Sequence, residues 1–229
     1  MGGERMSERR RRSRRRAAGG VDVFGILRER ISSHALPPGS RLREQDLASE
    51  FDVSRARIRE AFGALEQRGL IERIPNRGAV VVRLDPRQMY DLYDVRRVLE
   101  AYVARLAAER APDAAWAELT ERFGRPLEQA IAKGDFDTYL EALESLHARM
   151  VEFAGNSILA DMLDLIGDKT LVISRRVIIL PGRAEIGIKM HRRLLQALTL
   201  RDADAAEAEM RQILSSARDY LEKFHNFVI

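Results

Sequence analysis

Four arginines are the residues of this chain whose type and spacing most directly predict a chemistry. Arg55, Arg57 and Arg59 occupy alternate positions, and Arg77 lies in a Pro-Asn-Arg-Gly segment. A guanidinium can hold a phosphate and can also donate two parallel hydrogen bonds to the O6 and N7 atoms of guanine. If a helix presents the first three and a turn presents the fourth, these residues predict contact with DNA. The alternative is a solvated helix face, where charged side chains are common.

A second set of polar residues lies in the C-terminal part of the chain. His147 and His191 each share a helical face with leucines and other apolar residues. Each histidine is either a hydrogen-bonded core residue or part of a pocket for a small effector. Arg96 borders another apolar face, where it can anchor a carboxylate or pair with Glu100 one helical turn away. The sequence leaves both alternatives open for each of these residues.

Two short helices are predicted ahead of the arginines. The first follows an apolar stripe from Phe24 to Leu36 and is stopped by Pro37-Pro38-Gly39. The second covers residues 44–51, with Leu47, Ala48 and Phe51 facing inward, and Asp52-Val53 makes the turn that follows it. This spacing is typical of a helix-turn-helix unit.

A third helix and a hairpin complete the N-terminal domain. Ser54 can cap this helix because its hydroxyl can accept from an exposed backbone N–H, and Gly69 ends it. Its inward face consists of four apolar residues at helical spacing: Ile58, Ala61, Phe62 and Leu65. Strands are expected over residues 71–73 and 79–83, around a turn at residues 75–78. The order of elements predicts a winged helix-turn-helix.

Everything after Asp85-Pro86 is predicted to be helical. Six helices are expected, at residues 86–110, 113–132, 135–154, 157–178, 185–200 and 202–225. Short loops between them predict an antiparallel six-helix bundle, so the fold class is mainly α. Motifs of nucleotide-binding proteins and of α/β-hydrolases are absent from the sequence. Two histidines without a third ligand, and without a nucleophile–base pair, argue against an enzyme.

Charge and composition divide the 229 residues into three segments. Residues 1–20 hold eight Arg against two Glu and predict a disordered tail, which is either simply solvated or adds salt-sensitive attraction to DNA phosphates. Residues 21–83 carry a net charge of +2 and residues 84–229 a net charge of −4. The chain has no cysteine and no apolar run of the roughly 18 residues that span a membrane. We therefore expect a cytoplasmic, nucleoid-associated protein without a membrane partner.

The N-terminal segment resembles the GntR family of bacterial transcription regulators. The resemblance is carried by Leu36-Pro-Pro-Gly39, Leu42-Arg-Glu44, Leu47-Ala48, Val53-Ser-Arg55, Arg59-Glu-Ala61, Leu65-Glu66, Gly69-Leu70 and Arg77-Gly78. It implies DNA contacts at Gln45, Ser54, Arg55, Arg57, Arg59, Arg77 and Gly78. Arg57 departs from the family pattern, which usually has proline or a small residue there, and this added cation predicts a different operator preference.

The C-terminal segment resembles the ligand-sensing FCD domain of the FadR branch, and its helix count is similar to that of the VanR subgroup. The matching residues are Asp94–Glu100, Leu146-His147, Ala154–Asn156, His191–Ala197 and Ala206–Met210. Many such domains hold a divalent metal with an aspartate and three histidines. The corresponding positions here are Leu143, His147, His191 and Ile213. Because firm binding needs three or four donors, we expect no cofactor, with a weakly held divalent ion as the alternative.

These features predict a homodimeric transcription regulator that binds a palindromic operator and a small-molecule effector, and the resemblance implies a repressor. Residues 21–83 form the DNA-binding domain, and residues 84–229 bind the effector through Arg96, His147 and His191 and form the dimer. The effector is either a carboxylate or, if Leu143 and Ile213 dominate, a more apolar molecule. The alternative is a DNA-binding protein whose helical domain only dimerises. A dry, filled bundle would favour that alternative, whereas a polar-lined cavity would favour sensing.

Overall fold

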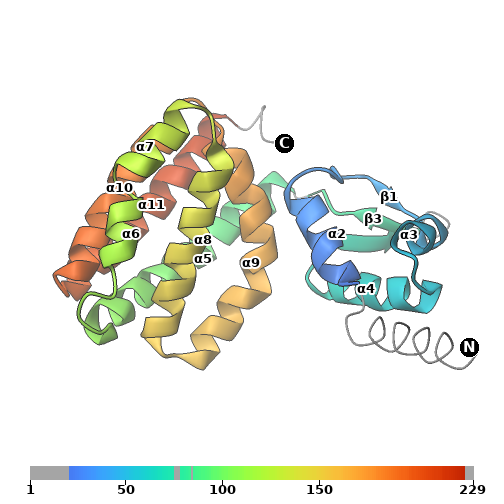
Figure 1. Cartoon of the computed structure of the whole chain (residues 1–229), viewed down its shortest axis with the longest axis horizontal. Coiled ribbons are helices and arrows are strands. Elements are labelled where there is room, and N and C mark those ends of the chain that lie inside the picture. The colour runs from blue at the N-terminus through green and yellow to red at the C-terminus, as the bar shows by residue number, and fades with distance from the viewer. Residues whose placement is uncertain (1–20, 75–77, 84, 225–229) are drawn as a thin grey trace, which may run out of the picture. The chain divides into compact units, whose positions relative to one another are not determined.

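The computed structural model describes residues 21–74, 78–83 and 85–224 (Figure 1). The chain divides after Val82 into two compact units. Within the described ranges the N-terminal unit combines helices with a small sheet, whereas the C-terminal unit is helical. No helix in these ranges is long and apolar enough to cross a membrane. The mainly α fold class predicted from the sequence is confirmed.

The N-terminal unit is a winged helix-turn-helix. Its helices are α2 (Val23–Ser32), α3 (Glu44–Phe51) and α4 (Arg55–Gln67). Strands β2 (Ile71–Ile74) and β3 (Gly78–Val81) form an antiparallel pair. A two-residue strand, β1 (Arg41–Leu42), pairs with the other edge of β3, so that the sheet order is β1-β3-β2. The sequence predicted the hairpin but not β1.

Helix α2 ends earlier than predicted. Its last residue is Ser32 rather than a residue near Leu36. His34 takes a left-handed conformation (φ 64°), and the Leu36 N–H donates to the Arg30 carbonyl at 2.8 Å. The helix is therefore closed by its own backbone before the two prolines are reached.

The turn between α3 and α4 sets the start of α4. Asp52 takes a left-handed conformation, which a short polar side chain tolerates, and its N–H donates to the Ala48 carbonyl. Ser54 then caps α4 as predicted, because its hydroxyl accepts from the Arg57 N–H at 3.3 Å. The four apolar residues expected on the inward face of α4 are all buried: Ile58, Ala61, Phe62 and Leu65. This anchoring leaves the opposite face of α4 in solvent.

The C-terminal unit has seven helices in the described residues, one more than the sequence predicted: α5 (Pro86–Arg110), α6 (Ala117–Arg122), α7 (Arg125–Ala132), α8 (Phe136–Ala154), α9 (Ser157–Ile178), α10 (Arg183–Thr199) and α11 (Ala203–Lys223). The single helix expected over 113–132 is divided into α6 and α7. Pro126 cannot donate a backbone hydrogen bond, and Gly124, just before α7, takes a non-helical conformation (φ −80°, ψ −139°). An uninterrupted helix is therefore not formed there.

Helix α5 is the central element of the C-terminal unit. It packs most extensively against α11 and α8, and more lightly against α9 and α10. Side-chain caps begin three of the surrounding helices, and each accepts from the N–H three residues later: Asp135, Asn156 and Asp202. The cap at Asn156 was predicted from the sequence. The packing of α8, α9, α10 and α11 around α5 places inward-facing residues of these five helices around one internal space.

Candidate functional site

The exposed face of α4 carries the three arginines that the sequence assigned to this helix. Arg55, Arg57 and Arg59 are all exposed, whereas the four apolar residues of the helix face the core. Ser54 lies at the N-terminus of the same helix. The helix therefore presents guanidinium groups to a partner while its buried face holds it in place.

Two of these arginines are held by one acidic residue of α3. The Oε2 atom of Glu44 lies 3.4 Å from Nη2 of Arg55 and 3.4 Å from Nε of Arg59. Arg57 points elsewhere, because its Nη2 donates to the Val21 carbonyl at 3.3 Å. The three guanidinium groups therefore form a bridged pair and one separate cation.

The other predicted DNA-contact residues lie on α3 and at the wing. Gln45 is exposed on α3, one residue after Glu44. Gly78 begins β3 with φ +78°, a left-handed conformation that favours glycine, and it pairs with Ile74 across the hairpin. Arg77 lies outside the described residues. The described part of the site is thus one face of α3 and α4 together with the start of β3.

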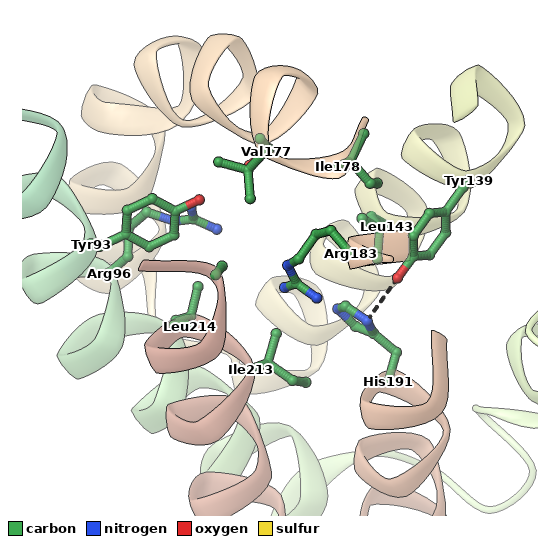
Figure 2. Close-up of a pocket in the computed structure, with 12 residues that line it drawn as sticks. Tyr93, Arg96, Tyr139, Leu143, Val177, Ile178, Arg183, His191, Ile213 and Leu214 are labelled. Atoms are coloured by element: carbon green, nitrogen blue, oxygen red, sulfur yellow. Dashed lines mark hydrogen bonds between the residues drawn. The ribbon is translucent and has the colours of Figure 1, made fainter. Parts of the chain in front are cut away.

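A pocket of about 70 Å³ lies inside the C-terminal unit (Figure 2). Its lining comes from α5, α8, α9, α10 and α11 and combines aliphatic residues with a few polar ones: Tyr93, Arg96, Tyr139, Leu143, Ser174, Val177, Ile178, Arg183, His191, Ile213, Leu214 and Ala217. A mostly apolar wall with a few convergent polar groups is typical of a small-molecule site.

Arg96 lies in the pocket wall but is already paired. Its Nε donates to Glu100 Oε1 at 2.6 Å, and both side chains are buried. Burial raises the pKa of Glu100, but the charge of Arg96 and its hydrogen bond, together with the nearby His147 and His191, outweigh burial and lower this pKa. The Arg96 guanidinium also lies 5.0 Å from the centre of the Tyr93 ring. The intrahelical pair with Glu100, one of the two alternatives left open by the sequence, is therefore present.

His191 is neutral and presents one nitrogen as an acceptor. Its Nδ1 lies 2.7 Å from the Gly187 carbonyl, which can only accept, so Nδ1 carries the proton and Nε2 carries the lone pair. Burial lowers the pKa of His191 to about 4. The Tyr139 hydroxyl lies 3.3 Å from Nδ1, and burial raises the pKa of Tyr139, so that its hydroxyl stays protonated.

Arg183 is the pocket residue that sequence reasoning missed. It is buried at the first position of α10, and Figure 2 shows its side chain reaching between Ile213 and His191. Its guanidinium lies 5.7 Å from the centre of the Tyr220 ring, and among the described residues it forms no ion pair with an acidic side chain. The sequence predicted the start of this helix at residue 185, whereas α10 begins at Arg183. A cation in the first turn of a helix, which the helix dipole disfavours, could therefore not be recognised from the predicted bounds.

His147 is not among the residues that line the pocket. It lies on α8 with a half-exposed side chain, and its Nδ1 is 3.8 Å from Glu100 Oε2. The structure therefore brings Arg96 and His191 to one cavity and places His147 behind the buried Arg96–Glu100 pair.

The pocket residues do not fit a metal ion. Leu143 and Ile213, at two of the four family positions, line the pocket with aliphatic side chains. In the described ranges no cluster of three or more histidine, cysteine or acidic residues is arranged to hold a metal. The Arg183 guanidinium would also repel a cation there. Chemically the pocket suits an anion better than a metal.

The fold and these two sites define the class of protein: a winged helix-turn-helix with exposed arginines, joined to a helical unit, is a DNA-binding transcription regulator. Two family models match the chain: bacterial regulatory proteins of the gntR family over residues 21–81, and the FCD domain over residues 91–216. The chain therefore belongs to the GntR family, with an FCD domain as its C-terminal unit. It is a regulator and not an enzyme.

Individual relatives agree with this assignment. The chain is 30% identical over 192 residues to the uncharacterized HTH-type transcriptional regulator YdhC of Bacillus subtilis (strain 168), which covers 82% of this chain and 84% of the relative. It is 28% identical over 195 residues to the HTH-type transcriptional repressor RspR of Escherichia coli (strain K12), with 84% of each chain covered. The solved structure of E. coli McbR/YncC shares the fold, with a TM-score of 0.77 and 23% sequence identity. The match covers 90% of this chain and 98% of the McbR/YncC chain.

Proposed function

We propose that this chain is a repressor that binds a palindromic operator as a homodimer and responds to a small carboxylate. The observation that carries the proposal is a pocket in the helical unit whose mostly apolar wall includes the buried polar residues Arg96, Arg183 and His191. Burying charged groups costs free energy, and a unit that only dimerises has no need of them. The pocket thus favours the sensing protein over the alternative that only dimerises. The name of the E. coli relative, a repressor, supports the direction of regulation.

The charges of the pocket support an acidic effector. The charge of Arg96 is compensated by Glu100, whereas Arg183 has no acidic partner among the described residues. A carboxylate would supply that missing negative charge, since guanidinium and carboxylate make charge-assisted hydrogen bonds. The lone pair on His191 Nε2 would accept from a hydroxyl or amine on the same ligand. We therefore add Arg183 to the proposed effector residues Arg96 and His191.

The size of the cavity supports a small effector. One water molecule needs about 10–15 Å³ of such space, so a cavity of about 70 Å³ holds only a few non-hydrogen atoms. Leu143 and Ile213 add apolar wall to this space rather than further charge. A short-chain acid fits these dimensions better than a long acyl chain.

The DNA contacts of the proposal are on α3, α4 and the wing. Gln45, Ser54, Arg55, Arg57, Arg59 and Gly78 are the proposed contacts within the described residues, and Arg77 is the proposed contact outside them. In a twofold dimer, two copies of α4 would contact two half-sites of a palindrome. Regulation then requires that the effector bind the DNA-bound and free forms with different affinities, because otherwise it cannot shift the equilibrium.

Replacing Arg183 by glutamine tests the proposed effector site. The operator is first selected from randomised duplexes with the wild-type protein. The Kd of the protein for this operator is then measured by fluorescence anisotropy, in the presence of carboxylic acids of two to six carbons or of their neutral amides. We expect at least one acid to change the operator Kd about tenfold, within the usual range of allosteric coupling. The matching amide should have no effect, and Arg183→Gln should abolish the response.

Arg193→Gln is the matched control, because Arg193 lies on the same helix but is exposed and paired with Glu209. It should respond as the wild type does. A full acid response in Arg183→Gln would contradict the role of Arg183. If no acid changes the operator Kd of the wild type, the helical unit only dimerises and the sensing proposal is wrong.

A further inference from the structure

Glu44 occupies an unusual position for an acidic residue in a DNA-binding unit. It is the first residue of α3, where the helix dipole favours a negative charge. One oxygen of its carboxylate faces both Arg55 and Arg59, each at 3.4 Å. Two proposed DNA-contact residues therefore share a single counter-charge that a different helix supplies.

The geometry favours a positioning role over a stabilising one. The Glu44 side chain is 26% exposed, whereas the side chains of Arg55 and Arg59 are 63% and 57% exposed. Exposed ion pairs contribute little to stability. Arg55 and Arg59 are one helical turn apart on α4 and repel each other, and the carboxylate between them holds the two guanidinium groups in a defined relation. Their outer surfaces remain open to a partner.

We infer that Glu44 is a specificity-determining residue, which positions Arg55 and Arg59 for base contacts and weakens binding to DNA of any other sequence. This inference rests on the proposed DNA contacts of these two arginines. A phosphate contact needs only a nearby cation, whereas base readout needs a guanidinium in a fixed orientation. The negative charge of Glu44 also opposes phosphates of every sequence alike. Glu44 thus lowers general affinity while favouring the correct bases.

Arg57 illustrates the contrast within the same helix. Its guanidinium is held by the neutral Val21 carbonyl rather than by an acid. Its full positive charge therefore remains available to phosphate. The arrangement divides the three arginines of α4 into a bridged pair for bases and one cation for the DNA backbone.

The test compares two substitutions of Glu44 on two DNA duplexes. The full chain is titrated at several salt concentrations with the operator selected from randomised duplexes and with a mixed-sequence duplex of equal length. Glu44→Gln removes the charge, whereas Glu44→Asp keeps it but shortens the reach to the arginines. Glu50→Gln is the charge-matched control, since Glu50 pairs at 2.6 Å with Arg30 of α2 rather than with α4.

We expect Glu44→Gln to tighten mixed-sequence binding about threefold and to reduce the ratio of mixed-sequence to operator Kd about tenfold, near the value of one good base contact. Its salt dependence should steepen by about one phosphate equivalent. Glu44→Asp should reduce the ratio without tightening mixed-sequence binding. Glu50→Gln should shift both Kd values by a common factor and leave the ratio unchanged.

The inference is overturned if Glu44→Gln behaves as Glu50→Gln does, because Glu44 then acts only through net charge. Arg59→Ala separates this failure from failure of the proposed DNA contacts. If Arg59→Ala binds operator as tightly as the wild type, the contacts themselves are wrong. If Arg59→Ala binds operator weakly and Glu44→Gln keeps the wild-type ratio, only the positioning role fails. Circular dichroism of each variant confirms that the helices are intact.

Discussion

At the scale of single residues, the pocket shows two ways of burying an arginine. Arg96 lies next to Glu100, and the two charges compensate each other inside the helical unit. Arg183 is equally buried but faces the cavity without an acidic partner among the described residues. Local rules of charge burial are usually broken only at functional sites. The uncompensated cation, rather than the paired one, is therefore the residue around which we place the ligand.

His191 makes the stability of the apo protein sensitive to acid. Burial lowers its pKa to about 4, from an ordinary value of 6.5. Between these pH values the unfolded chain binds a proton that the folded chain does not, so stability falls as the pH decreases from 6.5 to 4. Linkage predicts a loss of about 3 kcal/mol across this window from His191 alone.

Urea unfolding at pH 7.5 and pH 4.5 measures this effect. His191→Gln should lose about 2 kcal/mol less than the wild type between the two pH values, because most of the window lies between them. His147→Gln is the control, because it removes a half-exposed histidine that lies outside the pocket. An equal loss of stability in His191→Gln and in the wild type would show that His191 does not titrate as described.

At the scale of elements, the close approach of α8 to α10 depends on one glycine. A Cβ at Gly187 would lie 2.6 Å from the Tyr139 hydroxyl oxygen and 2.9 Å from Arg183 Nη1. The Gly187 carbonyl also accepts the hydrogen bond that orients His191. The absence of a side chain at this position of α10 therefore brings three polar pocket groups together.

Gly187→Ala should destabilise the protein by about 1–3 kcal/mol, because the buried Tyr139 and Arg183 side chains must move to make room for the added methyl group. Gly167→Ala on α9 is the matched control, because a Cβ there meets nothing within 4 Å. It should instead stabilise the helix by about 0.5–1 kcal/mol. Thermal and urea unfolding of the two variants would show changes of opposite sign. A stabilised Gly187→Ala protein would mean that the pocket is looser than the structure indicates.

At the scale of the whole molecule, the proposed dimer needs a self-complementary surface. Two helices that pack against each other, α5 and α9, both leave large apolar side chains in solvent: Val95, Val98, Tyr102, Ile158, Met162 and Leu165. Residues three, four or seven positions apart on a helix share one face, so these side chains form one stripe on each helix. Clustered exposed apolar side chains are typical of interaction surfaces, and we expect this one to form the homodimer.

Val98→Asp or Met162→Asp should convert the dimer into a monomer, because a carboxylate would lose its hydration in the interface. Operator affinity should then fall about tenfold or more, since the second half-site is no longer bound in the same complex. Leu200→Asp is the control, because Leu200 is 69% exposed but lies outside both stripes. Analytical ultracentrifugation measures the oligomeric state of each variant, and operator titration measures its affinity for the operator. Dimeric Val98→Asp and Met162→Asp proteins would exclude this surface.

Much of the fold could be predicted from the sequence because it depends on neighbours within one or two helical turns. The cap at Ser54, the bounds of α3, the buried face of α4 and the cap at Asn156 all follow from such local spacing. The choice between the two alternatives for Arg96 could not be made in this way, even though its partner is only one turn away. Whether Arg96 pairs with Glu100 or anchors a carboxylate depends on which residues of other helices surround these two side chains.

Features that join distant segments were decided only by the tertiary structure. Strand β1 exists because Arg41 and Leu42 meet β3, nearly forty residues later in the chain. The bridge from Glu44 to the arginines of α4 requires the turn at Asp52, and the pocket requires five helices to converge. Periodicity shows that a residue faces inward but not what it meets there. The sequence alone thus determined a DNA-binding regulator with a helical second domain, and three-dimensional packing decided that Arg183 lies in the wall of its pocket.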